Sequence, residues 1–131
     1  MKTASEQIKS GEKTRKQINF EKKIRAGASI KILIRHEDLQ LRGNCLASGD
    51  AAEDERAAVE IERQLDSGNE WAWCAVEVRA EWEGLGSSDY LGGCSYRNEA
   101  DFKTGGYYDD MKDAALSELC IRAWAIAQDA K

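Results

Sequence analysis

The 131-residue sequence contains no proline and only one histidine, His36. Without proline, no helix or strand is interrupted by a residue that lacks a backbone N–H donor. A catalytic triad or a metal shell would have to rely on this single imidazole. Glu37 and Asp38 follow it, but adjacent residues of a strand face opposite ways, so Glu37 is not placed to orient the ring. We therefore expect His36 to be a surface residue at a strand end.

Cysteine is sparse and lacks metal-ligand spacing. No two of the four cysteines lie within four residues of each other, which excludes a CxxC half-site. The first residues also lack the apolar segment of a signal peptide, so we expect a cytoplasmic protein with reduced, structural thiols and no cofactor. A cross-strand pair between Cys74 and Cys94 is the alternative. The cysteines are Cys45, Cys74, Cys94 and Cys120.

Long apolar runs are absent as well. No segment approaches the roughly 20 apolar residues that a membrane-spanning helix needs. Hydrophobic residues make up 42% of the chain and charged residues 33%. This composition is typical of one globular core with a heavily solvated surface.

Charge is present in quantity and is divided unevenly along the chain. Residues 1–35 hold ten Lys/Arg and three Glu, a net charge of +7, whereas residues 36–131 hold nine basic and 21 acidic residues, a net charge of −12. We interpret this as a basic helical arm, residues 1–26, joined to an acidic domain, residues 27–131. Such a division favours electrostatic binding to a partner. The alternative is that the arm docks on its own acidic body.

Periodicity and capping signals predict the elements. Residues 3–25 form a polar helix with a thin apolar stripe, and residues 28–36 alternate as a strand of β-branched residues. A helix follows over residues 51–66, where Asp50 and Glu53 have the form of a capping box. Its inner face should carry Ala58, Ile61 and Leu65.

The second half of the chain predicts a hairpin and a final helix. Residues 70–83 form the strongest strand, residues 87–96 return beside it, and Gly92–Gly93 marks a bulge. A helix then begins near residue 108. The order is αβαββα, and we expect an α+β fold with a three-stranded, mostly antiparallel sheet and helices on one face. Ser88, Tyr90, Gly92, Cys94 and Tyr96 should share one strand face.

The glycine-rich segments do not form a phosphate-binding loop. "GLGSSDYLGG" has no Lys to reach a phosphate. "TGGYYDD" opens a helix, but Asp109 and Asp110 would repel an anion there. The many carboxylates single out no catalytic pair, so we expect a protein that is not an enzyme and has no catalytic or metal-binding residues.

Three groups of residues are candidates for binding a macromolecule. An acidic surface could imitate a nucleic acid, exposed aromatic residues could anchor it, and the basic arm could contact phosphates directly. Direct nucleic-acid binding is expected only through this arm. The acidic candidates are Asp50, Glu53, Asp54, Glu77, Glu81, Glu83, Asp109 and Asp110; the aromatic candidates are Trp71, Trp73, Tyr90 and Tyr107; the basic candidates are Lys13, Arg15, Lys16, Lys22, Lys23 and Arg25.

A specific pattern in residues 71–111 resembles a family of small temperate-phage accessory proteins. These proteins tend to share a W-x-W strand, a D-x-L-G-G-C-S-Y strand, and the D-F and G-Y-Y-D-D-M motifs at a helix start. The resemblance extends over residues 41–120 and leaves the basic helix outside it. The matching positions are Trp71, Trp73, Asp89, Leu91 to Tyr96, Asp101, Phe102 and Gly106 to Met111.

The resemblance implies a function in the conflict between phage and bacterium. Phages of this kind encode small acidic proteins that inhibit host defence, so we expect an anti-CRISPR protein that binds a Cas effector complex in the cytoplasm of the infected host. The alternatives are a phage DNA-binding accessory protein and a nucleotide-binding sponge. The thin stripe of the first helix leaves a homodimer open.

Overall fold

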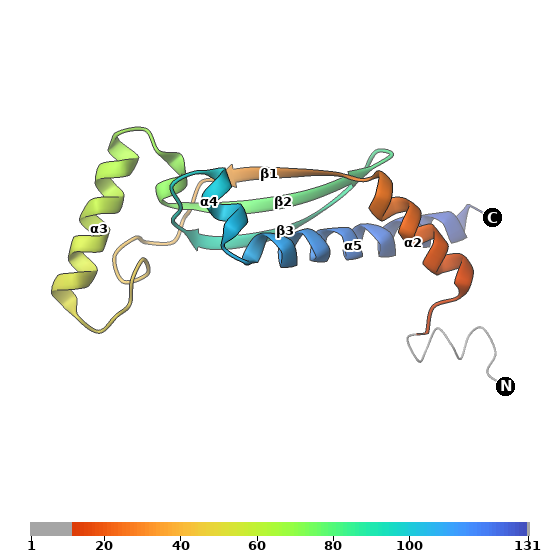
Figure 1. Ribbon diagram of the computed structural model, residues 1–131, viewed down its shortest axis with the longest axis horizontal. Coiled ribbons are helices and arrows are strands. Elements are labelled where there is room, and N and C mark those ends of the chain that lie inside the picture. Colours follow the sequence, from red (N-terminus) through yellow and green to blue (C-terminus); the bar gives the residue numbers. More distant parts are fainter. Residues whose placement is uncertain (1–11, 131) are drawn as a thin grey trace.

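The computed structural model describes residues 12–130 and combines a three-stranded antiparallel sheet with helices, as the α+β prediction required (Figure 1). The predicted αβαββα order is confirmed, and a 3₁₀ turn and a short helix add to it. No helix within residues 12–130 has the length and apolar character to cross a membrane. In chain order the elements are α2 (Arg15–Gly27), β1 (Ser29–Arg35), α3 (Ala51–Asp66), η1 (Glu70–Ala72), β2 (Cys74–Trp82), β3 (Leu85–Cys94), α4 (Glu99–Thr104) and α5 (Tyr107–Asp129).

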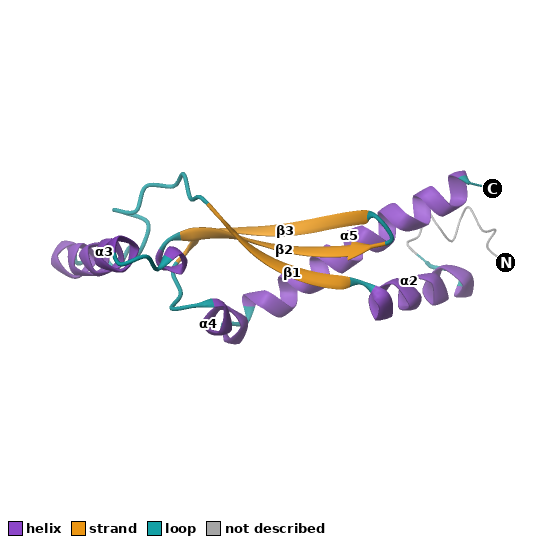
Figure 2. Cartoon of the chain, turned by 90° about the horizontal axis from the view of Figure 1, so that it is seen from above, coloured by secondary structure: helices purple, strands orange, loops and turns teal. Residues whose placement is uncertain are grey.

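The sheet has the order β1-β2-β3, so β2 is the central strand and pairs antiparallel with both neighbours. Helix α5 runs diagonally beneath the sheet and covers the inner face of β2 and β3. The opposite face, called the open face here, has no helix of residues 12–130 over it (Figures 1 and 2). Val76, Val78 and Ala80 of β2 face α5 and are fully buried. The register places Ile30 opposite Ala80, Ile32 opposite Val78 and Ile34 opposite Val76.

The core has two centres, one at each end of α5. Near its C-terminal half, Leu119 and Ala123 pack with Ile24 of α2 and Ala80 of β2. Near its N-terminus, Phe102 of α4 is fully buried. Its ring lies 5.3 to 6.0 Å from the rings of Trp71, Tyr96 and Tyr108.

A bulge in β3 confirms the expectation for Gly92–Gly93. Val76 pairs with Leu91 but Cys74 pairs with Cys94, so β3 contains one extra residue there. Gly93 has φ 64°, a conformation that glycine adopts without steric cost. Because the bulge changes the alternation of β3, the prediction of one shared face is wrong: Cys94 is buried on the inner side, whereas Tyr90 is exposed.

The second strand starts later than predicted. Residues 70–72 form the 3₁₀ turn η1, because the Asn69 side chain accepts a 3.2 Å hydrogen bond from the Trp71 backbone N–H. The predicted strand over residues 70–83 is therefore shortened to Cys74–Trp82.

Helix α2 packs into the common core. Thr14 caps its first turn, Ile24 is fully buried, and Phe20 contacts the rings of Trp82 and Trp124 at 6.1 and 5.3 Å. Within the predicted arm, residues 1–11 lie outside the described residues. The part that is described docks on the body, which is the alternative left open by the sequence.

Helix α3 begins and ends where the sequence predicts, but it lies beyond the end of the sheet and not on its face (Figure 1). Ala58 is its one buried residue, and Leu65 remains 37% exposed. Arg42, in the loop that precedes α3, binds both Glu55 and Glu62. Helix α3 is thus held by its own loop and by η1, with a small apolar contact.

Candidate interaction surfaces

The most acidic part of the molecule is a lobe at one end, formed by residues 36–70. It contains ten Asp/Glu and three Arg, which gives a net charge of −7 with His36 neutral. Helix α3 forms its outer part and projects away from the sheet (Figures 1 and 2). We call residues 36–70 the acidic lobe.

Arginines neutralise only some of the lobe's carboxylates. Arg42 Nη2 lies 2.8 Å from Glu55 Oε1 and 2.6 Å from Glu62 Oε1, and Arg63 lies 2.5 Å from Glu60. The guanidinium of Arg63 lowers the pKa of Glu60 to about 2, and Arg42 lowers the pKa of Glu55. These carboxylates therefore stay ionised at neutral pH.

Three predicted acidic residues lie together in the acidic lobe. Asp50 is the α3 N-cap and accepts hydrogen bonds from the backbone N–H groups of Ala52 and Glu53 at 3.0 and 3.3 Å. Asp54 accepts from the Ser48 hydroxyl at 2.7 Å. Glu53 is exposed in the first turn, where the helix dipole favours its negative charge.

Two other predicted acidic residues, Glu77 and Glu81, lie on the open face and are bound to cations. Glu77 is only 3% exposed and contacts Arg35 at 2.7 Å, so its place on an accessible acidic surface is a wrong prediction. Glu81 pairs with Lys31 at 2.8 Å. The reason is cross-strand geometry, which brings basic residues of β1 beside these carboxylates.

The remaining acidic candidates lie in two further places. Glu83 is exposed in the turn between β2 and β3, with φ 46°. Asp109 and Asp110 are exposed in the first turn of α5. The eight predicted carboxylates thus occupy separate regions, and the acidic lobe unites only Asp50, Glu53 and Asp54.

The aromatic candidates are also not brought together. Trp71 packs on Phe102 with 5.8 Å between ring centroids, so it contributes to the core. Trp73 donates from Nε1 to the Leu39 carbonyl at 3.0 Å and thereby holds the loop of the acidic lobe. Tyr90 and Tyr107 are 64% and 55% exposed on different elements.

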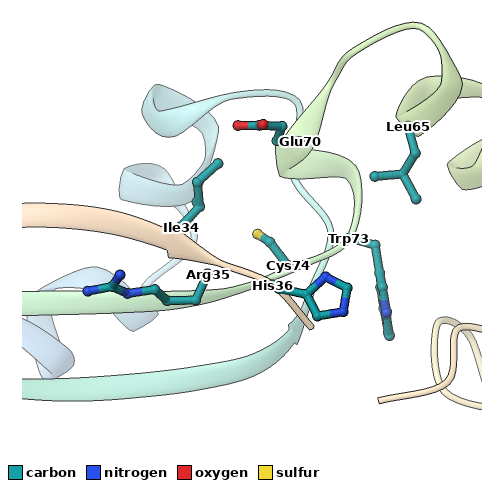
Figure 3. A pocket seen from close by; sticks show the side chains of 7 residues that line it. All are labelled: Ile34, Arg35, His36, Leu65, Glu70, Trp73 and Cys74. Carbon is teal, nitrogen blue, oxygen red and sulfur yellow. The ribbon is translucent and has the colours of Figure 1, made fainter. Parts of the chain in front are cut away.

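A cleft of about 290 Å³ separates the acidic lobe from the ends of β1 and β2 (Figure 3). His36 lies at its rim with 88% of its side chain exposed, as predicted for a strand end. Sequence reasoning missed the cleft, because only the tertiary fold brings residues 34–36 beside Leu65 and Trp73. The lining residues are Ile34, Arg35, His36, Leu65, Glu70, Trp73 and Cys74.

Cys74 and Cys94 are direct cross-strand partners, and both are free thiols. Both are buried, and burial raises the pKa of Cys74 to about 12. The structure therefore agrees with the reduced, structural interpretation. Within residues 12–130, no group of three or more His, Cys, Asp or Glu side chains is arranged to hold a metal ion.

The basic candidates lie at the opposite end of the molecule from the acidic lobe (Figure 1). Two of them are engaged: Lys13 with Glu21 at 2.8 Å, and Arg25 with Asp113 at 2.9 Å. The other four are exposed and form no ion pair with any carboxylate of the described residues. These four are Arg15, Lys16, Lys22 and Lys23.

The molecule is therefore electrically polarised along its length, with the acidic lobe at one end and α2 at the other. No protein-family model, curated protein or solved structure matches this chain.

Proposed function

We propose that this chain is a non-enzymatic binding protein whose acidic lobe docks in a cationic cleft that a partner protein uses for nucleic acid. The observation that carries the proposal is a net charge of −7 concentrated in residues 36–70, at a projecting end of the molecule. Charge gathered in this way steers a basic partner and accelerates association.

Three carboxylates of α3 and η1 support this role because they remain available, whereas Glu55, Glu60 and Glu62 are paired with arginines. Glu53, Asp66 and Glu70 are exposed and have no cationic partner within residues 12–130. A helix holds such groups on a rigid rod with a turn of about 5.4 Å, so the negative charge is extended and not a single point. An extended anionic rod competes for a groove that binds a phosphate backbone.

The cleft of Figure 3 offers a binding site for a side chain of the partner, next to the carboxylates of the acidic lobe. Trp73 offers an aromatic ring, Leu65 an apolar wall and Glu70 a carboxylate. A guanidinium or ammonium group of the partner could stack on the ring and pair with the carboxylate. Such an anchor would add specificity to the long-range attraction.

More specifically, we propose that the chain is a phage-encoded inhibitor of bacterial defence. It would act as an anti-CRISPR protein that blocks nucleic-acid binding by a Cas effector complex in the host cytoplasm. The resemblance of residues 41–120 to temperate-phage accessory proteins supports this setting. The nucleotide-sponge alternative has no supporting observation in the described residues.

The test reverses three exposed carboxylates of the acidic lobe together: Glu53→Lys, Asp66→Lys and Glu70→Lys. A matched control reverses Glu83, Asp110 and Asp129, which are exposed outside the acidic lobe and change the net charge equally. Target-DNA binding by a panel of purified CRISPR effector complexes is measured with each protein.

The unmodified protein should block DNA binding by one effector, and the lobe variant should lose at least about tenfold in potency while the control keeps it. Rising salt should weaken the inhibition. Equal loss in both variants would assign the effect to total charge. Inhibition that survives the lobe variant would refute docking through the acidic lobe.

A second function, DNA binding through α2, is favoured by four cations of that helix that form no ion pair within residues 12–130. The triple variant Lys16→Glu, Lys22→Glu and Lys23→Glu tests it by fluorescence anisotropy with labelled duplex DNA. A DNA-binding protein would lose its affinity and its steep salt dependence in this variant. An unmodified protein that binds no duplex at low salt would exclude this function.

A further inference from the structure

Strand β1 is an edge strand whose inner face is only partly covered. Its inward side chains Ile30, Ile32 and Ile34 are half-buried, although Val76 and Val78 beside them on β2 are fully buried. Within residues 12–130, helix α5 passes beneath β2 and β3 and leaves the edge of β1 uncovered between α2 and α4 (Figure 2). A strip of branched apolar side chains thus borders an exposed backbone edge.

The other edge of the sheet is occupied. Arg122 of α5 donates hydrogen bonds to the Gly86 carbonyl and, at 3.2 Å, to the Ser87 hydroxyl. At the far end of β3, the Glu37 carboxylate accepts a hydrogen bond from the Gly93 backbone N–H. Such side chains and a bulge are the usual means of protecting an edge strand.

Strand β1 has two charged residues, Lys31 and Arg35, but neither of the two devices found on β3. It contains no bulge, and no side chain within residues 12–130 hydrogen-bonds to its outer backbone. Its sequence, SIKILIR, is rich in β-branched residues. A regular edge of this kind is a template for pairing with another strand.

We propose that β1 pairs antiparallel with β1 of a second copy of this chain, forming a continuous six-stranded sheet around a two-fold axis perpendicular to it. The pairing joins the two half-covered isoleucine strips on the same face. It does not depend on the proposed function, because the acidic lobe lies beyond the sheet end.

Charge selects one register for this pairing. Residues that lie opposite each other in an antiparallel pair share one face of the sheet, so the inner residues of both copies stay on the same face only if the two-fold axis passes beside a residue and not between two residues. In the seven-residue strand β1, an axis beside Lys31, Ile32 or Leu33 forms at least five residue pairs between the two copies. An axis at Lys31 sets that residue opposite itself, and an axis at Leu33 sets Lys31 opposite Arg35. An axis at Ile32 forms seven pairs, with Lys31 opposite Leu33 and Arg35 opposite Ser29. Only this register avoids opposed like charges, which destabilise a sheet.

The same two-fold symmetry brings together flanking helices of opposite charge, α2 of one copy and α4 of the other. The end of β1 at Ile30 packs with the core of α2, and the end at Ile34 packs with the cluster that contains Phe102 of α4. The two-fold axis therefore brings α2 of one copy to the same end as α4 of the other. Helix α2 has five Lys/Arg and one Glu, whereas residues 99–113 have five Asp/Glu and two Lys.

The first test compares two variants, each of which places a lysine directly beside Glu77. Leu33 on β1 and Tyr90 on β3 are both direct cross-strand partners of this residue. Leu33→Lys and Tyr90→Lys each add one lysine beside the same carboxylate, at opposite edges of the sheet. Sedimentation equilibrium measures the dimer dissociation constant of both variants and of the unmodified protein.

Leu33→Lys sets a lysine opposite Lys31 of the second copy twice in each dimer, so the dissociation constant should rise about tenfold. Tyr90→Lys should leave it unchanged. Equal weakening by both variants, or an unmodified protein that stays monomeric at millimolar concentration, would overturn the proposal. Far-ultraviolet circular dichroism verifies that both variants fold.

The second test reads the register by cysteine cross-linking in a Cys45→Ser background, which removes the one half-exposed native thiol. With the axis at Ile32, this residue faces its own copy with β-carbons about 4.5–5.5 Å apart, whereas Leu33 is diagonal to its copy and too distant. Mild oxidation should therefore join chains of Ile32→Cys and not those of Leu33→Cys. The reverse result would overturn this register.

Discussion

Arg35 and Glu77 form an ion pair in which the two partners differ sharply in exposure. Arg35 Nη2 and Nε lie 2.7 and 2.9 Å from Glu77 Oε1, and the Glu77 side chain is 4% exposed while that of Arg35 is 57% exposed. Ser88 donates a 2.6 Å hydrogen bond to the other carboxylate oxygen. The buried Glu77 carboxylate thus receives hydrogen bonds from both neighbouring strands, from Arg35 of β1 and from Ser88 of β3.

The Glu77 network should make stability depend on pH. The hydrogen bond from Ser88, followed by the contact with Arg35, lowers the pKa of Glu77 below its ordinary value of 4.5. Its contribution is therefore complete above that value and is lost as the pH falls through the lower folded-state pKa. Glu77→Gln should reduce the free energy of unfolding at neutral pH by about 1–3 kcal/mol and should flatten the loss of stability below pH 4.5.

Urea unfolding at a series of pH values measures this effect. Glu53→Gln is the control, because Glu53 is exposed on α3 and its removal should change the free energy by less than about 0.5 kcal/mol. An acid dependence as steep in Glu77→Gln as in the unmodified protein would contradict the role of this network.

Among single truncations in the core near α4, Phe102→Ala should reduce the free energy of unfolding most. Phe102 is fully buried, and the rings of Trp71, Tyr96 and Tyr108 surround it. Phe102→Ala leaves a cavity among rings that cannot collapse, so the free energy of unfolding should fall by about 3–5 kcal/mol. Urea titration followed by tryptophan fluorescence measures it. Ile121→Ala is the control, because Ile121 is 59% exposed and should contribute little.

Asp50 should stabilise α3 as its N-cap. Its carboxylate accepts from two backbone N–H groups that have no partner within the helix. Asp50→Ala should cost about 1 kcal/mol, and Asp50→Asn should retain most of that stability. Hydrogen exchange should show faster opening confined to residues 51–66 in the alanine variant, because α3 has a small apolar contact with the remaining fold. Exchange that accelerates equally in β2 would contradict this separation.

The cysteines should differ in reactivity according to burial. Cys74 is 2% exposed and burial raises its pKa to about 12, so its reactive thiolate is scarce at neutral pH. Cys45 is partly exposed. Iodoacetamide should modify Cys45 first, and mass spectrometry should detect modification of Cys74 and Cys94 only after denaturant is added. Cys45→Ser should abolish the early adduct, and rapid labelling of Cys74 in the folded state would contradict the buried geometry.

Local sequence signals determined much of the secondary structure. The alternation of residues 28–36, the capping residue Asp50 and the glycine pair of β3 each act within a few residues, so they could be interpreted without the fold. The short helix α4 escaped prediction because its six residues give little periodicity. The late start of β2 escaped because one Asn69 hydrogen bond outweighs the strand preference of the residues after it.

Of the candidate surfaces, the sequence by itself determined how much charge each segment has, and the tertiary structure decided where that charge lies. Arg35 and Glu77 are 42 residues apart, and only strand pairing brings them together and removes Glu77 from the surface. Likewise, Trp71 enters the core because Phe102 is folded beneath it, and α3 lies beyond the sheet because its loop and η1 hold it there. The physical reason is that local conformation follows short-range backbone preferences, whereas burial and the grouping of charges depend on contacts between distant segments.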